Sequence, residues 1–499
     1  MNRSILCFAL AGANLCLLPC RGADAAQALL IENVTVLSPQ QAQPRGNQYV
    51  LVRDGRIAAV SDRAIAAPDA RKLDGSGKFL TPGIMDGHVH VSDAVGLPFG
   101  STDPAIAEME RQFLVQQPRS YLYFGVTQVV DLINRPARVA EFTAQPQHPD
   151  TYRCGLATVV DGYPLVFWDP ATRYAQFDDY IYEPANAREH PLPAGADPAA
   201  HTPEAVVERI AKTDAICVKI TLEDGFGDRS DWPLMSLETL RRVRAATRQH
   251  GLLLLVHANA LDMQRRAVEG QVDIIAHGLW NWNELQNQPG IPPAIADHLR
   301  NIRGQKIGYI ATLRVLPGVI DLLDPTLLDD PAYPKVVPPA ILKWYHTDAA
   351  QWFKTEVFGP KPDAAGILEG RRAADARWAT SENGMRALRH LFELGQPLLL
   401  GSDTPSAPTY GNQPGYDTFR EMQMMARAGI PLSAIFAAAT INNARAYRME
   451  KDYGTVEKGK IANLLLLDAN PLADVDAWSR IEQVILRGEP IDRESLAAN

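Results

Sequence analysis

The chain has 499 residues, of which 46% are hydrophobic and 21% are charged, a composition typical of a folded globular protein. Its formal net charge of -9 argues against nucleic-acid binding, because an acidic surface repels phosphate backbones. The length allows one large domain and one smaller domain.

Residues 1–26 are typical of a secretory signal peptide. Arg3 supplies a positive start, an apolar run follows from Ile5 to Leu18, and Ala23-Asp24-Ala25 offers a cleavage site. The apolar run is too short to span a membrane comfortably, and no other segment approaches one. We therefore expect an exported protein, periplasmic or secreted, with no membrane span. Leu17-Leu18-Pro19-Cys20 loosely resembles a lipoprotein signal, but proline directly before the cysteine fits that signal poorly.

Both ends of the mature chain have the character of β-strands. At the N-terminal end these are 29–38, 49–53 and 56–61, with Asp54-Gly55 as a strong hairpin signal between the last two. At the C-terminal end, 462–467 and 483–486 alternate with turn-rich sequence. We expect 27–82 and 450–499 to form one small β-sandwich domain.

Between these ends, residues 83–449 alternate apolar strand-like runs with helical patterns. The expected strands are 83–91, 126–132, 155–160, 215–222, 252–258, 273–277, 306–313 and 397–403, and the clearest helices are 236–249, 418–428 and 432–447. Continuous apolar strands that alternate with helices favour a parallel sheet covered on both sides. Eight such units predict an α/β fold, a closed (β/α)₈ barrel.

Two connections, 161–214 and 314–379, are unusually long. Each follows a barrel strand, so each should emerge at the carboxyl ends of the strands, where barrel enzymes carry their chemistry. Aromatic residues such as Phe167 and Trp168 are expected mainly to hold these insertions together.

Cys154 and Cys217 are the two cysteines that remain after the signal peptide is removed. In an exported protein these two cysteines could form one disulfide. Because both cysteines lie in apolar, strand-like runs, however, we expect two buried free thiols.

The first chemical motif is Gly87-His88-Val89-His90. Residues i and i+2 of a strand point to the same face, so the two imidazoles can form half of a metal site. Further polar residues stand alone in apolar strand runs: Lys219, His257, His277 and Asp403. A barrel interior cannot bury four imidazoles, an ammonium and a carboxylate unless they serve one another or a metal.

The motifs resemble those of the amidohydrolase superfamily. Leu80-Thr81-Pro82-Gly83-Ile84-Met85-Asp86-Gly87-His88-Val89-His90 is similar to its entry strand, and 454–464 (GTVEKGKIANL) is similar to the segment that returns to its small domain. The order H-x-H, Lys, His, His, Asp matches the binuclear pattern of the superfamily, closest to its imidazolonepropionase-like and Xaa-Pro-dipeptidase-like branch. Asn463 departs from the Asp of many relatives, in the small domain and away from the metals.

This resemblance implies a role for each residue. His88 and His90 would hold the more buried metal together with Asp403, and His257 and His277 would hold the outer metal. Lys219 would be N6-carboxylated and bridge both, which is consistent with the lowered pKa of a buried lysine. Zinc is the expected metal, and manganese or another divalent ion also fits.

The resemblance further implies hydrolysis of a C–N bond in a small-molecule substrate by a hydroxide that bridges the metals, with Asp403 as the catalytic proton carrier. Amide, peptide and cyclic amide bonds all fit. The alternatives are a lactonase, an esterase or a phosphotriesterase on the same site, and more remotely a non-catalytic binding protein. The substrate, the native metal and the state of assembly, including a homo-oligomer, stay open.

Four further residues stand where a substrate could be met. Tyr163 follows the third barrel strand, Asn259 and Trp280 each follow a metal histidine, and Arg314 follows the seventh strand. For each, a purely structural role is an equal alternative.

Overall fold

The computed structural model describes residues 28–41, 43–98, 100–226, 230–373, 376–406 and 408–499. The expected signal peptide and its three cysteines lie outside these residues. Among the described helices, none combines the length and apolarity needed to cross a bilayer.

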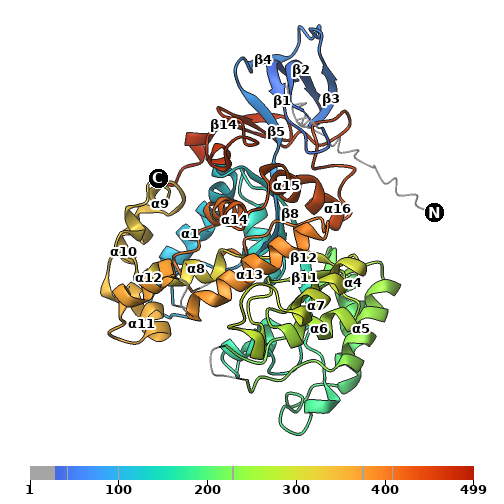
Figure 1. Cartoon of the computed structure of the whole chain (residues 1–499), viewed down its shortest axis with the longest axis vertical. Helices are drawn as coiled ribbons and strands as arrows, with labels where there is room; N and C mark the ends of the chain where they lie inside the picture. The colour runs from blue at the N-terminus through green and yellow to red at the C-terminus, as the bar shows by residue number, and fades with distance from the viewer. Residues whose placement is uncertain (1–27, 42, 99, 227–229, 374–375, 407) are drawn as a thin grey trace, which may run out of the picture.

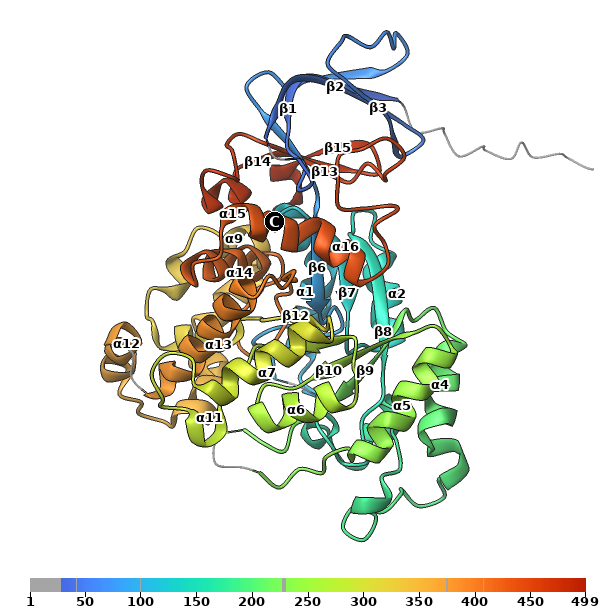
Figure 2. The ribbon, with the colours of Figure 1, turned by 45° about the vertical axis from the view of Figure 1, so that its right-hand side comes forward.

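The upper part of the molecule is a sheet that unites both ends of the chain (Figures 1 and 2). Its strands from the N-terminal side are β1 (Leu29–Val36), β2 (Arg45–Arg53), β3 (Arg56–Ser61), β4 (Arg71–Asp74) and β5 (Phe79–Pro82), and those from the C-terminal side are β13 (Leu464–Leu467), β14 (Ile481–Leu486) and β15 (Glu489–Asp492). Asp54 and Gly55 both have positive φ, which makes the tight turn between β2 and β3 that the sequence predicts. The strands follow one another in the hydrogen-bonded order β15-β14-β13-β5-β1-β2-β3, with β4 paired to β1.

Below this sheet lies the barrel, which confirms the predicted (β/α)₈ class. Seven parallel strands follow one another in chain order: β6 (Ile84–Val89), β7 (Val126–Asp131), β8 (Asp150–Leu156), β9 (Cys217–Thr221), β10 (Leu253–His257), β11 (Ile274–Ala276) and β12 (Gly308–Ile310). The eighth segment, 397–403, closes the ring through single bridges, Leu399 to Ile310 on one side and Thr404 to Val89 on the other.

Helices cover the barrel on its outer side (Figure 2). They are α1 (Pro104–Tyr123), α2 (Pro136–Thr143), α4 (Pro203–Ala211), α5 (Leu237–Gln249), α6 (Leu261–Glu269), α7 (Pro293–Gly304), α13 (Ala376–Glu393), α14 (Tyr416–Arg427), α15 (Leu432–Ala437) and α16 (Asn443–Ala446). Ser236 caps α5, where its side chain accepts a hydrogen bond from the Thr239 amide. The single helix expected at 432–447 is interrupted by a π-helical turn, Ala438–Asn442. After this turn, the side-chain amide of Asn443 donates to the backbone carbonyls of Met85 and Leu400.

Both long connections contain helices, although the first is largely irregular between them. The first contains α3 (Arg173–Gln176) and α4, and the second contains α8 (Val315–Ile320), α9 (Tyr333–Val336), α10 (Pro339–Tyr345), α11 (Trp352–Phe358) and α12 (Ala364–Ala373).

The third barrel strand lies earlier in the chain than its apolar run predicts. β8 spans Asp150–Leu156 instead of 155–160, and Asp150 at its start accepts a hydrogen bond from Asn463. The polar residues of β8 therefore meet the C-terminal segment. Because the amino end of β8 abuts the small sheet, the carboxyl ends of the barrel strands face away from it.

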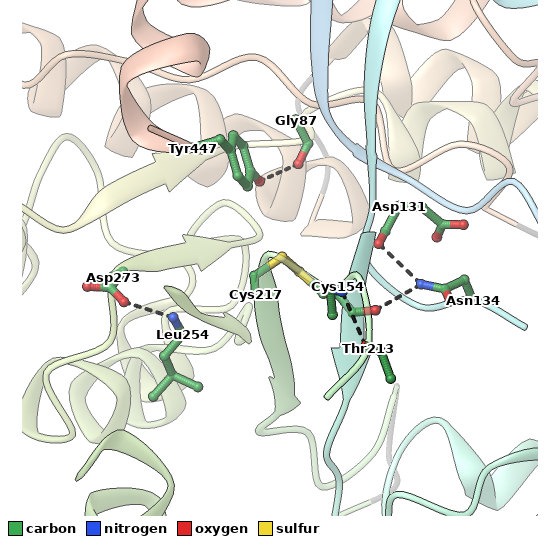
Figure 3. The surroundings of a disulfide bond; sticks show 10 residues. Gly87, Asp131, Asn134, Cys154, Thr213, Cys217, Leu254, Asp273 and Tyr447 are labelled. Carbon is green, nitrogen blue, oxygen red and sulfur yellow. Dashed lines mark hydrogen bonds between the residues drawn. A yellow bond between two sulfur atoms is a disulfide. The ribbon is translucent and has the colours of Figure 1, made fainter. Parts of the chain in front are cut away.

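The expectation of two free thiols is wrong, because Cys154 and Cys217 form a disulfide. They are direct partners in the parallel pairing of β8 with β9, and both lie in the apolar cluster inside the barrel with Met85, Leu255 and Ile310. Figure 3 shows the bridge between the two strands, with the Asn134 amide donating to the Cys154 carbonyl. The sequence separation of 63 between the cysteines conceals this pairing in the sequence.

Replacing both cysteines by alanine is expected to lower stability. A cross-link across 63 residues contributes about 4 kcal/mol in the chain-entropy estimate. The midpoint of urea denaturation should therefore fall in the variant. Reductant should lower the wild-type midpoint toward that of the variant and leave the variant unchanged. An equal midpoint in both proteins, or two reactive thiols from Cys154 and Cys217 in non-reduced wild type, would contradict the disulfide.

Candidate functional site

The six residues expected to bind metal come together at the carboxyl ends of the barrel strands. His88 and His90 come from β6 and the residue after it, Lys219 from β9, and His257 ends β10. His277 directly follows β11, and Asp403 ends the closing segment. All except His90 are buried.

The inner group contains His88, His90 and Asp403. The Nε2 atoms of both imidazoles lie 2.8 Å from Asp403 Oδ1. One donor atom from each residue falls within 4.8 Å of the others, which is close enough for a single metal ion.

An irregularity in β6 sets the direction of these side chains. Between Asp86 and Val89 the strand carries one more residue than β7 opposite it, a β-bulge. A Cβ atom at Gly87 would stand 3.0 Å from the Leu400 carbonyl oxygen, so only glycine fits this close approach.

Asp86 joins the two strands that carry the inner group, a role that the sequence reasoning missed. Its carboxylate accepts hydrogen bonds from the His88 and Ser402 amides and from the Thr418 hydroxyl. The side chain is fully buried, and the Asp403 amide donates to the His88 carbonyl nearby. Asp86 therefore fixes the spacing of His88 and Asp403.

The outer group contains His257 and His277, whose Nδ1 and Nε2 atoms lie 2.8 Å apart. It adjoins the inner group, because the rings of His88 and His277 are 4.9 Å apart and His277 Nδ1 is 3.7 Å from Asp403 Oδ2.

The remaining nitrogens of the outer histidines have partners of their own. His257 Nε2 lies 3.1 Å from Glu223 Oε2, and His277 Nδ1 lies 2.9 Å from Thr312 Oγ1. Such contacts fix the tautomer and the orientation of metal-binding imidazoles. Glu223 was missed in the sequence, although an acidic residue so soon after Lys219 and the apolar run of β9 was a usable signal.

Glu223→Gln is expected to weaken metal binding at the outer group. Partners of this kind typically contribute 10- to 100-fold in metal affinity, so a loss of about tenfold or more should follow. Titration of metal-free protein with zinc, read by competition with a chelator, measures it. Glu238→Gln on α5 is a control from the acidic first turn of a surface helix. Unchanged affinity in Glu223→Gln would mean that this carboxylate does not orient His257.

Burial sets the protonation of the site. It lowers the pKa of His88 to about 3 and that of His277 well below its usual value, so both imidazoles are neutral and offer lone pairs. Burial by itself would raise the pKa of Asp403, but the adjacent imidazoles of His88 and His277 outweigh it and hold this pKa well below its usual value. Asp403 is therefore a carboxylate.

Lys219 is the buried cationic residue of the site. Its Nζ atom has no hydrogen-bond partner among the described residues. Burial lowers its pKa to about 7, against the opposing charge of Asp403. A substantial fraction of this amine is therefore neutral and nucleophilic near neutral pH.

The donor set fits two divalent cations. Neutral imidazole nitrogens and a carboxylate oxygen are ligands for zinc and similar ions, and they meet here in two adjoining groups. An unpartnered Lys219 amine is costly in a buried site unless it is modified or covered by a ligand.

Of the four candidate substrate contacts, Tyr163 and Trp280 have rings beside the outer group, and Asn259 follows His257 in the chain. The Tyr163 ring is 4.6 Å from the ring of His257, and the Trp280 ring is 5.3 Å from that of His277. The Asn259 carbonyl accepts the amides of Trp280 and Asn281, which fixes the Trp280 backbone.

The fourth, Arg314, lies in a different environment from the one expected. Its guanidinium is buried and donates to Asp321 at 2.5 Å, to Asp417 at 3.3 Å and to the Gly411 carbonyl. Glu421 accepts the amides of Leu313 and Arg314. These contacts make Arg314 a structural cation, which binds the second long connection to α14 and does not favour substrate contact.

Comparison with known sequences agrees with the motifs. Residues 364–491 match the amidohydrolase family. An N-acetylglucosamine-6-phosphate deacetylase of Lysinibacillus sphaericus is 31% identical over 157 residues, which are 31% of this chain and 38% of the relative. An imidazolonepropionase of Klebsiella pneumoniae is 41% identical over 139 residues, 26% of this chain and 32% of the relative. The chain thus spans well under half the length of these relatives.

Solved structures are similar over nearly the whole chain. A Xaa-Pro dipeptidase with bound methionine in its active site has a TM-score of 0.62 at 18% identity, covering 93% of this chain and 100% of the other. The ochratoxinase of A. niger has a TM-score of 0.64 at 18% identity, covering 94% and 96%. The sequence match at the C-terminal end is therefore to the amidohydrolase family, and the solved structures share the fold of nearly the whole chain.

Proposed function

We propose that the protein is a metal-dependent hydrolase that cleaves an amide, peptide or cyclic amide C–N bond of a small molecule. The observation that carries this proposal is the convergence of two groups of metal donors beside the buried Lys219 at the barrel mouth. The deacetylase and imidazolonepropionase among the relatives support the same class of reaction.

Two divalent ions bound here, zinc by preference, would make water acidic enough to attack at neutral pH and would polarise the scissile carbonyl. His88, His90 and Asp403 would hold one ion, and His257 and His277 would hold the other. Asp403 starts as a carboxylate, so it can accept the proton of the attacking water and return it to the leaving nitrogen.

Lys219 takes part after reaction with carbon dioxide. Its neutral amine adds to the carbon of CO₂ and loses one proton, which gives an N6-carboxylate with two oxygens between the donor groups. The low pKa and the unpartnered Nζ atom of Lys219 support this step.

The test combines metal analysis with a panel of substrates. The purified protein should contain two divalent ions per chain and should hydrolyse members of a set of N-acyl amino acids and dipeptides. Lactones and organophosphates belong in the same panel. Turnover of these alone would identify an esterase or phosphotriesterase, and turnover of none would argue against a hydrolase.

We also infer that the protein is exported. Cleavage near Ala26 or Gln27 would leave β1, which begins at Leu29, intact. A disulfide inside the barrel supports an oxidising compartment. N-terminal sequencing of protein from the periplasm or the medium should find a start at or next to Ala26. An intact Met1 on that material would contradict export by cleavage.

A further inference from the structure

Four aromatic side chains form one cluster beside the outer metal group. Tyr163 and Phe167 come from the connection after β8, and Phe226 and Trp232 come from the connection after β9. Ring centroids within the cluster are 5.3–6.5 Å apart, so every ring contacts the other three. We call these four residues the aromatic cluster.

The inner end of the cluster is fixed against the metal site. The ring of Tyr163 lies 4.6 Å from that of His257. The Tyr163 carbonyl accepts hydrogen bonds from the hydroxyls of Thr158 and Thr221, which belong to the top of the barrel. The position of this ring relative to His257 is therefore set by the barrel itself.

The outer end of the cluster is open. Phe167 is 64% exposed and Phe226 is 47% exposed, whereas Trp232 beneath them is buried. Their rings are nearly parallel, and each packs edge-on against Trp232. Exposed rings gathered on a buried aromatic base are a typical binding surface for an apolar group.

The charges nearby favour an uncharged group. Glu223 and Asp224, which directly precede this part of the chain, are acidic and offer no partner to an anionic side chain of the substrate. The Glu223 carboxylate is buried and committed to His257, so it is not free to pair with a cation. Arg314, which the sequence offered as a substrate contact, is paired with Asp321 and Asp417 instead.

We propose that the aromatic cluster is a specificity subsite that receives an aromatic group of the substrate, on one side of the scissile C–N bond. This rests on the proposed function, because the subsite adjoins the outer metal group of that site. The substrates would then be aromatic amides, such as N-acyl derivatives of phenylalanine or phenylacetyl derivatives of small amino acids.

The experiment compares matched substrates. The first pair is N-acetylphenylalanine and N-acetylalanine, which differ by a ring on the leaving side of the C–N bond. The second pair is phenylacetylalanine and N-acetylalanine, which differ by a ring on the acyl side. Burial of one phenyl group should raise kcat/KM about tenfold or more in at least one pair. In Phe167→Ala/Phe226→Ala, the aromatic substrate should lose about tenfold or more and N-acetylalanine at most about threefold.

Val115→Ala on α1 is the matched control, since Val115 is also a large exposed apolar residue and makes none of these ring contacts. Both proteins should melt at the wild-type temperature. The subsite would be overturned if neither pair showed a preference for the aromatic substrate, or if the double variant lost activity equally on all substrates. A preference for N-acetylarginine would also overturn it.

A binding measurement separates this proposal from the proposed function. Calorimetric titration of the zinc-loaded protein with 3-phenylpropanamide and with propanamide should show tighter binding of the phenyl compound, and the double variant should lose the difference. Ring binding without hydrolysis of any amide would refute the proposed function and keep the subsite. Amide hydrolysis without a preference for the ring would refute the subsite and keep the proposed function.

Discussion

Lys219→Ala is expected to lose bound metal and activity together. The N6-carboxylate proposed for Lys219 would be a ligand shared by both donor groups, and even residues that only orient a metal ligand contribute 10- to 100-fold in affinity or activity. We therefore expect activity to fall about a hundredfold or more. Elemental analysis after dialysis, with kinetics on the same sample, measures both losses.

Lys212→Ala provides the control, because Lys212 is an exposed lysine paired with Glu208 on the surface. It should retain metal and activity. A full metal complement in Lys219→Ala would show that the lysine is structural. Partial rescue of this variant by short carboxylic acids would support a bridging role, because they return the missing oxygens.

The same residue predicts a pH dependence of metal reconstitution. Only the neutral amine adds CO₂, and burial lowers the pKa of Lys219 to about 7. Below this pH the ammonium form dominates, so at constant dissolved CO₂ the rate should fall about tenfold for each further pH unit. Above it the rate should level off. A rate that kept rising to pH 10 would indicate an ordinary, exposed lysine.

Asp403→Asn is expected to keep much of the metal while kcat falls about a hundredfold or more. His88 and His90 would still bind the proposed inner ion after the loss of one carboxylate, because both imidazoles lie beside Asp403. The proton carrier, however, is lost, because an amide has no basic oxygen that could return a proton to the leaving nitrogen. Metal content and kcat, measured on one preparation, separate the two effects.

A series of substrates with different leaving groups supplies the control for this variant. A leaving group that departs without protonation needs no proton carrier, so the deficit of Asp403→Asn should shrink toward such substrates. Near-normal kcat on an amide with a poor leaving group would assign the proton transfer to another residue.

Most of the metal site was predictable because its signals are local. His88 and His90 share a strand, and Lys219 and His257 each interrupt an otherwise apolar run. The barrel class followed from the same alternation of runs. The bulge in β6 and the buried carboxylate of Asp86 bring these side chains within hydrogen-bond distance of one another. Both features depend on contacts between segments far apart in the chain, which the sequence does not reveal.

The features that the sequence could not settle share one physical cause, because the direction of a side chain and the register of neighbouring strands are tertiary properties. Cys154 meets Cys217 only because β8 pairs with β9 in one register. Arg314 turns inward because Asp321 and Asp417 lie there. The apolar run after Leu156 had the hydrophobicity of a strand but continues beyond β8 into the connection that carries Tyr163.

The sheet shared by the two ends of the chain makes its N-terminal strands depend on its C-terminal ones. β5 pairs with β1 on one side and with β13 on the other, and β13 follows the whole barrel in the chain. Without β13, β5 keeps one edge of unpaired backbone groups. A chain cut within the barrel would therefore display an open strand edge that carries Leu80, and such an edge favours pairing with other chains.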